Sequence, residues 1–512
     1  MSLRSIGSNW LLTAIAVIVA YVLMPYTLQA LGEAQYGTWL LITSVTSHLG
    51  LLILGLPMAT IRFLAERTVG DHEDLNDAVG SCVWIYVILS ALALPIGLAL
   101  FLVFRTLYNE PIPAAIGPQV PIAFALVVVQ TAVGFLGLLP FGIMAAHDDF
   151  GTRNRVLILS TLLRFGLTLA LLRSFPSIVA LAGVLVACMA TEIILGLAML
   201  RRRYPHVRLK PGRFGWGTTR RLLTFSAYVL IATVGSQLIF QTDALVIGKV
   251  LDVRLVPYFA SASSFSIYLM GFVIAAETVI VPVTSRLVAQ GKFGELRDQF
   301  LMWSKLSVSL TLLVVIYLVV SGPRFLGWWM ADHFEGPSGD VLRILMLSNV
   351  IFLPVRAVSL PILMGLGKPR VPAFGFLITG VVNVALSVLL GKSFGLKGIA
   401  IGTALPNVAF AIFLLVFTCR ELDASLKTFV RYVVPRPFLG AIPALAVLVW
   451  FHSVVDVRSF PLLFLAGVLM LAIYAATSIL YVFASDSRLD LLAFVRHKVR
   501  SFRAPAPEVS GQ

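Results

Sequence analysis

Five ionisable residues lie inside long apolar stretches of the sequence, at Arg164, Glu192, Asp243, Glu277 and Arg356. A charged group at the centre of a bilayer costs roughly 2.5–3.5 kcal/mol on insertion scales, so such residues usually face a cavity or one another. An arginine can bind phosphate, because its planar guanidinium stays charged and donates several hydrogen bonds. A carboxylate can bind a coupling ion or pair with an arginine. The pattern predicts a polar site within a membrane, and a structural ion pair such as Arg164 with Glu192 is the alternative.

Uncharged polar residues accompany these charges at helical spacing. Thr161 shares a helix face with Arg164, and Asn349 precedes Arg356 by two turns. The expected substrate-binding residues are Arg356, Arg164, Asn349, Gln237, Gln241 and Asn383, and the expected ion-coupling or charge-pairing residues are Asp243, Glu277 and Glu192. Polar residues also join membrane helices through hydrogen bonds of about 0.6 kcal/mol each, which is the alternative for the amides and hydroxyls.

The composition requires a membrane to surround these residues. The chain has 512 residues, of which 59% are hydrophobic and 12% charged, whereas soluble domains carry about 25% charged residues. Apolar runs long enough to cross a bilayer recur throughout, which predicts an all-α membrane protein of fourteen transmembrane helices. The expected spans are 9–31, 38–61, 82–104, 119–146, 156–173, 177–200, 222–248, 256–285, 301–321, 341–365, 371–390, 396–419, 437–455 and 460–484.

The basic residues indicate how these spans are oriented. Of the 39 lysines and arginines, 28 fall at the termini and in the even-numbered loops, and nine in the odd-numbered loops. The positive-inside rule then predicts that both termini are cytoplasmic. The same count places Lys305 at the cytoplasmic edge. The net charge of +15 therefore reflects topology, and we expect no nucleic-acid partner.

A weak internal repeat divides the chain. Residues 31–67 resemble residues 251–287 at an offset of 220 positions, with Tyr36 and Tyr258 nearly in register. Transporters often consist of such repeats. The expected organisation is an N-lobe over 1–200, a basic cytoplasmic linker over 201–221, a C-lobe over 222–420, two further helices over 421–485 and a cytoplasmic tail over 486–512.

Several functional classes are disfavoured by what the sequence lacks. The longest expected external loop, 321–340, is too short for a catalytic domain, so we expect no enzyme. The GKS triplet at Gly391 lacks the P-loop glycine, since Leu386 stands in its place. The three cysteines lie far apart, in neither a disulfide nor a zinc pattern. We expect no cofactor and no metal.

Several segments resemble a known family. They are LGEAQYGTW (31–39), QTDALVIGKVLDVRLVPYFASASSF (241–265), RAVSLPILMGLGKPR (356–370) and FGLKGIAIGTAL (394–405). They resemble the polysaccharide exporters of the multidrug/oligosaccharidyl-lipid/polysaccharide superfamily, the Wzx-type flippases. The resemblance covers about residues 1–485. The chain departs from the family's glycine-tyrosine step, where it has Pro257 and Tyr258.

The resemblance implies a transporter in the bacterial cytoplasmic membrane. It would flip polyprenyl-pyrophosphate-linked oligosaccharides by alternating access, for O-antigen, capsule or exopolysaccharide synthesis. Its partners would be the lipid-linked oligosaccharide, membrane lipids, and a polysaccharide polymerase and glycosyltransferases. Arg356 would then meet a phosphate or sugar headgroup. A multidrug or cation antiporter of the same fold is the alternative.

The predicted topology can be tested with reporter fusions. Fusions at Gly212, in the basic linker, and at Gly336, in the long external loop, should report opposite sides of the membrane because of the basic bias. Labelling of both fusions from the same side would contradict the predicted topology.

Overall fold

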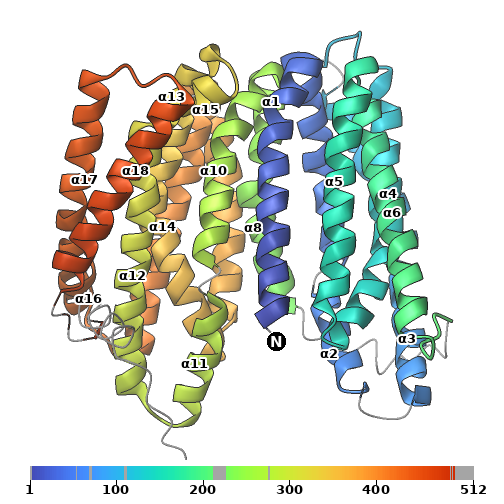
Figure 1. The fold of residues 1–512 in the computed structure, drawn as a ribbon, viewed down its shortest axis with the longest axis horizontal. Helices are drawn as coiled ribbons and strands as arrows, with labels where there is room; N and C mark the ends of the chain where they lie inside the picture. The colour runs from blue at the N-terminus through green and yellow to red at the C-terminus, as the bar shows by residue number, and fades with distance from the viewer. Residues whose placement is uncertain are drawn as a thin grey trace, which may run out of the picture. The chain divides into compact units, whose positions relative to one another are not determined.

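The computed structural model describes residues 3–53, 55–68, 72–108, 112–210, 227–274, 277–484, 486 and 488–489, and these residues are helical without a strand (Figure 1). The fold class expected from the sequence is therefore confirmed. Helices satisfy every backbone hydrogen bond within one segment, as a hydrocarbon environment requires. The helices are α1 (Leu3–Ser47), α2 (Leu56–Ala65), α3 (His72–Tyr108), α4 (Gln119–Ala146), α5 (Phe150–Ser174), α6 (Ile178–Arg203), α8 (Ala227–Phe240), α9 (Asp243–Val250), α10 (Val256–Ile274), α11 (Glu277–Ala289), α12 (Phe293–Val320), α13 (Gly322–Trp329), α14 (Glu335–Gly365), α15 (Arg370–Glu421), α16 (Leu426–Val433), α17 (Pro435–Val454) and α18 (Phe460–Thr477).

Among the described residues, eleven helical stretches are long and apolar enough to cross a membrane, or twelve if the bent pair α8 and α9 is one span. Two of these stretches are longer than one crossing needs, with 59 residues from Gly7 to Ala65 and 52 in α15. Each contains a glycine in the left-handed region, Gly32 with φ 74° and Gly395 with φ 60°, where a side chain would be strained. The protein is thus a multi-pass membrane protein, and the count of fourteen spans stays a prediction.

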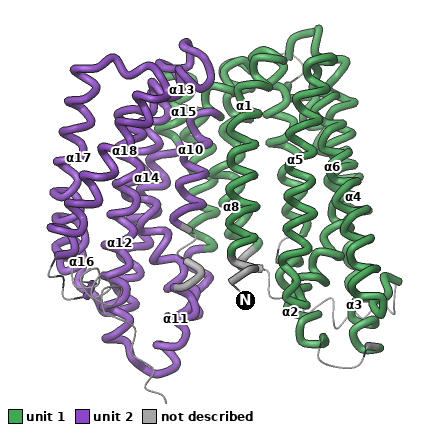
Figure 2. The backbone as a smooth tube through the Cα atoms, in the orientation of Figure 1, with its two compact units in different colours: residues 1–260, 373–402 green, residues 261–372, 403–512 purple. Residues whose placement is uncertain are grey.

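The described helices form two compact units, coloured separately in Figure 2. Unit 1 comprises residues 1–260 and 373–402, and unit 2 comprises residues 261–372 and 403–512. Their boundaries differ from the lobe boundaries expected from the repeat, because unit 1 extends to residue 260 and also includes residues 373–402 of α15. The lobes stay a prediction. Gly212 and most of the expected linker and tail lie outside the described residues.

In unit 1, the beginning of the segment 31–67 packs against residues 248–258, which include the start of the segment that resembles it. A Cβ atom on Gly37 of α1 would overlap the backbone carbonyl oxygen of Val253, and one on Gly248 would lie 2.8 Å from the Leu41 side chain. The Tyr258 hydroxyl donates a hydrogen bond of 2.6 Å to Glu33. The small residues of these motifs therefore allow α1 to approach α9 and its following turn at backbone distance.

In unit 2, the stretch 321–340 is mostly helical, where the sequence predicts a loop. It forms α13, a short 3-10 turn over Asp332–Phe334 and the first residues of α14, including Gly336. Aromatic packing accounts for the difference: Phe265 makes edge contacts with Phe325 and Trp329, with centroids 5.9 Å apart in both pairs. Such pairs contribute about 0.5–1.5 kcal/mol beyond their buried area.

The packing at Gly37 can be tested by adding one methyl group. Gly37→Ala should lower the apparent melting temperature in detergent, because overpacking against a backbone atom costs about 1–3 kcal/mol. Gly183→Ala is the matched control, since a Cβ atom on Gly183 of α6 meets nothing within 4 Å. Equal melting temperatures for Gly37→Ala and Gly183→Ala would contradict this account of the contact.

Candidate functional site

A polar cavity lies among α4, α5 and α6 of unit 1, all three of them apolar enough to span a membrane. Its volume is about 380 Å³. Its polar lining consists of Gln130 and Thr131 from α4, Ser160, Thr161 and Arg164 from α5, and Cys188 and Glu192 from α6. Two of the five charges singled out in the sequence, Arg164 and Glu192, thus line one cavity.

Glu192 is held by a hydroxyl group. Ser160 Oγ donates to Glu192 Oε1 at 2.6 Å, and Ser160 itself is buried. Within the part of the chain that the structure describes, no ion pair joins Arg164 to Glu192, although both side chains line the cavity. The arrangement therefore differs from a closed structural ion pair. It presents a guanidinium, a carboxylate and several hydroxyl and amide groups to the same space.

The packing of α4 against α6 fixes this geometry. A Cβ atom on Gly137 would lie 2.8 Å from Ile193, and one on Gly196 would lie 3.4 Å from the Phe141 ring. Glycines at these points let the helices approach closely. The side chains of Gln130 and Glu192, which lie further along the two helices, are thereby set around one cavity.

Asp149 ties the ends of α5 and α6 together. Its carboxylate accepts a hydrogen bond of 3.2 Å from the Thr152 amide, which caps α5, and pairs at 2.9 Å with Arg203 in the last turn of α6. Burial opposes the charge, but the bonds from Thr152 and Arg203 hold the pKa of Asp149 below its ordinary value. Asn76 links α3 to the segment after α6. Its side-chain amide donates a hydrogen bond to the His206 carbonyl, and its side-chain oxygen accepts one from the Arg208 backbone amide.

The remaining candidates of unit 1 lie on other helices. Asn383 is fully buried in α15, and among the described residues no hydrogen-bond partner reaches its side-chain amide or Oε1 of Gln237 in α8. The two helices cross closely, since a Cβ atom on Gly380 would meet Leu238 at 2.7 Å. Asp243 is buried at the start of α9.

Gln241 contributes its backbone to the structure, because its carbonyl oxygen accepts a hydrogen bond from Ser44 of α1. None of the side chains of Gln237, Gln241, Asp243 and Asn383 lines the cavity around Arg164. The structure therefore groups Arg164 with Glu192 and separates them from the other candidates of unit 1.

In unit 2, α14 carries Arg356 and Asn349. Arg356 is half-buried, and Asn349 donates a hydrogen bond of 3.1 Å from its side-chain amide to Ser266 Oγ of α10. Asn349 therefore joins two helices, in agreement with the structural alternative for this residue. The backbone of Glu277 begins α11, and its side chain lies outside the described residues.

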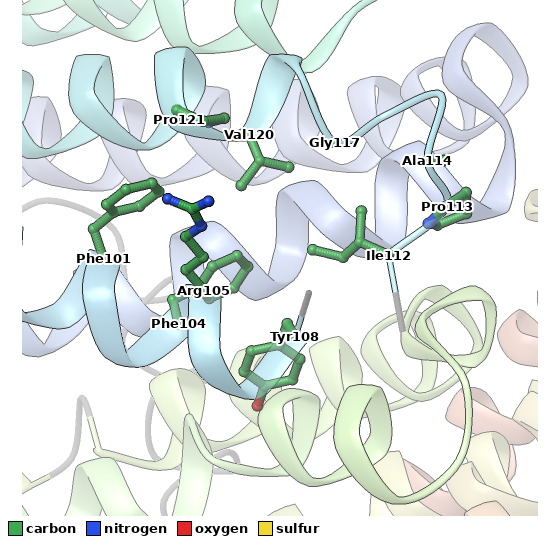
Figure 3. Close-up of a pocket in the computed structure, with 10 residues that line it drawn as sticks. All are labelled: Phe101, Phe104, Arg105, Tyr108, Ile112, Pro113, Ala114, Gly117, Val120 and Pro121. Carbon is green, nitrogen blue, oxygen red and sulfur yellow. The ribbon is translucent and has the colours of Figure 1, made fainter. Parts of the chain in front are cut away.

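A second, larger cavity of unit 1 lies where α3 ends and α4 begins (Figure 3). Its volume is about 630 Å³, and its lining is mainly apolar, with Phe101, Phe104 and Ile112. Arg105 extends along it toward Val120, while the Tyr108 hydroxyl points away and donates to the Leu245 carbonyl at 2.8 Å. Among the described residues that line this cavity, Arg105 is the one charged group, whereas Arg164 and Glu192 both line the other cavity.

Sequence reasoning missed Gln130, Thr131 and Ser160. Ser160 precedes Arg164 by four residues and so shares its helix face, which is a signal that could have found it. Gln130 and Thr131 adjoin the cavity only because α4 packs between α3 and α6, and the spacing along one helix holds no such information.

Two family models match most of the chain between them. The model described as a polysaccharide biosynthesis protein matches residues 2–288, and the model described as the lipid II flippase MurJ matches residues 153–470. A relative, an uncharacterized membrane protein of Methanocaldococcus jannaschii, is 20% identical over 241 residues, which are 45% of either chain. The chain thus spans about half the length of this relative.

Solved structures share the fold. The lipid II flippase MurJ in an inward closed conformation has a TM-score of 0.69 at 13% identity, covering 98% of this chain and 100% of MurJ. An inward-facing multidrug resistance MATE family transporter of the same superfamily has a TM-score of 0.66 at 16% identity, covering 83% and 95%. These families are transporters, not enzymes, and each family model spans more than half of the chain. The chain belongs to the polysaccharide biosynthesis protein family, also matches the lipid II flippase family, and has the fold of the multidrug/oligosaccharidyl-lipid/polysaccharide superfamily.

Proposed function

We propose that the protein carries polyprenyl-pyrophosphate-linked oligosaccharide units from the cytoplasmic to the outer face of a bacterial inner membrane. The oligosaccharide units delivered to the outer face would supply O-antigen, capsule or exopolysaccharide synthesis. The observation that carries the proposal is the cavity that presents Arg164 within α5. Arg164 lies ten residues before Ser174, or roughly 15 Å at 1.5 Å per residue, which is half the thickness of a hydrocarbon core of about 30 Å.

The chemistry of the cavity suits such a headgroup. The Arg164 guanidinium can donate two hydrogen bonds to a pyrophosphate, because its planar fork matches the phosphate oxygens. Gln130, Thr131 and Thr161 offer donors and acceptors to sugar hydroxyls. A polyprenyl tail would stay in the bilayer while the headgroup crosses.

Arg356 of unit 2 is a second candidate for headgroup binding, as an independent proposal for that unit. Alternating access would move the headgroup across. Both termini would be cytoplasmic, and the oligosaccharide would come from glycosyltransferases and pass to a polysaccharide polymerase.

A multidrug or cation antiporter is the second candidate. It is favoured by Glu192, because a carboxylate in the cavity can bind a cation, and by the fold shared with a MATE transporter. The two functions differ in their cargo. The antiporter would move organic cations in exchange for protons or sodium ions, whereas the flippase would move an anionic glycolipid.

The proposal is tested in vesicles that contain the purified protein and a fluorescent polyprenyl-pyrophosphate sugar. Arg164→Ala should slow flipping roughly ten- to hundredfold, because a hydrogen bond to a charged group contributes about 1.5–3 kcal/mol. Arg164→Lys should restore part of the rate, since charge survives while the bidentate geometry is lost. The Arg356→Ala variant should be inserted in the membrane at wild-type abundance but should fail to flip the glycolipid. Flipping should need no nucleotide.

Arg173→Ala is the matched control, because Arg173 is exposed in the last turn of the same helix. It should flip at the wild-type rate. A wild-type flipping rate in both Arg164→Ala and Arg356→Ala would refute the roles assigned to these arginines. A strict need for ATP would refute transport without nucleotide. Uptake of organic cations without glycolipid flipping would favour the antiporter.

Glu192 is the candidate for ion coupling in this cavity. Glu192→Gln keeps an acceptor for Ser160 but removes the charge, so flipping should become independent of an imposed proton or sodium gradient. Ser160→Ala removes the donor and keeps the carboxylate, and its flipping should keep the gradient dependence. Unchanged gradient dependence in Glu192→Gln would assign the coupling elsewhere.

A further inference from the structure

A basic cavity in unit 2 is lined by none of the residues discussed for transport. It has a volume of about 460 Å³ and is formed by α12, α16, the start of α17 and the segment after α18. The residues that line it are Lys305, Thr428, Arg431, Tyr432, Arg436, Asp486 and Arg488. Four cationic side chains and one anionic side chain of the described part of the chain thus surround one space.

The floor of this cavity is an ion pair with almost no solvent exposure. The side chains of Lys305 and Asp486 are each 1% exposed and are joined by a direct hydrogen bond. Lys305 also donates to the Val482 carbonyl at 2.8 Å. Asp486 accepts from the Tyr432 hydroxyl at 2.7 Å and from the Arg488 amide at 2.9 Å. Burying two charges is costly unless they are paired and hydrogen-bonded, and here both are.

The bonds to Asp486 offset the negative charge of the one carboxylate among the described residues that line the cavity. Burial opposes its charge, but the bonds from Lys305, Tyr432 and the Arg488 amide hold the pKa of Asp486 below its ordinary value. Arg488 is neutralised as well, because it pairs with Asp298 at 2.7 Å and stacks over the Tyr432 ring at 4.6 Å.

Two arginines at the cavity have no ion pair among the described residues. They are Arg431 and Arg436, and Arg436 makes a long contact of 3.5 Å with the Ala484 carbonyl. Both side chains are exposed, as is Thr428. A fixed positive charge therefore faces the cavity opening, beside two hydroxyl groups.

The helix that carries Arg431 has the form of an interfacial helix. In α16, Phe429 and Val433 are buried, and Phe429 stacks on Phe300 with centroids 5.3 Å apart. Leu426 and Val430 stay 44% and 47% exposed on a helix that also carries Lys427 and Arg431. Exposed apolar residues next to basic ones are typical of a helix that lies in the headgroup layer of a membrane.

We infer that this cavity binds the phosphate headgroup of an anionic phospholipid. Arg431 and Arg436 donate to the phosphate oxygens, Thr428 and Tyr432 line the remaining polar surface, and the acyl chains lie along the exposed apolar side chains of α16. Basic pockets at the edges of membrane helices bind such headgroups, and each basic residue contributes a roughly fivefold gain in affinity. The inference is independent of the cargo that the protein flips.

The test is lipid binding by the purified full-length protein, read by native mass spectrometry and by titration with phosphatidylglycerol in a phosphatidylcholine background. The double variant Arg431→Ala/Arg436→Ala should lose retained phosphatidylglycerol and weaken its binding at least about tenfold. Lys427→Ala is the matched control, since it removes one charge from the same helix without touching the cavity; it should bind as the wild type does.

Further ligands identify the source of the phosphate. Polyprenyl pyrophosphate and inorganic phosphate are titrated in parallel with phosphatidylglycerol. Competition by polyprenyl pyrophosphate, with no gain from phosphatidylglycerol over phosphatidylcholine, would overturn the phospholipid assignment in favour of a cargo site. Saturation by inorganic phosphate alone would overturn the need for a lipid. Equal binding of phosphatidylglycerol by the double variant and by Lys427→Ala, at unchanged melting temperatures, would refute the proposed lipid site.

Discussion

A polar group in hydrocarbon is costly unless it finds a partner within the protein, and much of the described structure depends on this constraint. Helices meet it for the backbone. Side chains meet it through specific pairs: Ser160 with Glu192, Asn349 with Ser266, and Lys305 with Asp486. Each pair joins two different segments of the same unit. The polar residues that stand out within apolar stretches of the sequence therefore also form bonds between neighbouring segments.

Close approach between helices is the second condition, and glycine supplies it. Hydrocarbon gives no hydrophobic force between two membrane helices, so their association depends on packing at short distance. Gly37 against Val253, Gly137 against Ile193 and Gly380 against Leu238 are three such contacts in unit 1. Gly37 lies in the family motif at 31–39, and a larger side chain at any of the three positions would separate the helices.

The two polar cavities differ in how they are built. The cavity around Arg164 lies within helices that span a membrane and presents its guanidinium beside a carboxylate that a serine holds. The basic cavity of unit 2 satisfies its buried charges first, through Lys305 and Asp486, and leaves Arg431 and Arg436 exposed beside an interfacial helix. The first arrangement suits a headgroup in transit, and the second suits a lipid that stays.

The sequence by itself determined the class of the protein and much of its local order. Apolar runs predict membrane helices because a bilayer accepts no other composition, and the loose motifs around 31–39 and 241–265 led to the correct superfamily. Arg164 and Glu192 stood out because a charge in an apolar run is rare. Only the tertiary structure decided that they line one cavity without an ion pair, that 321–340 is helical, and that Lys305 is buried against Asp486. Helical periodicity relates residues on one helix, whereas these facts depend on which helices pack together, and the partners lie 28 and 181 positions apart in the first and last cases.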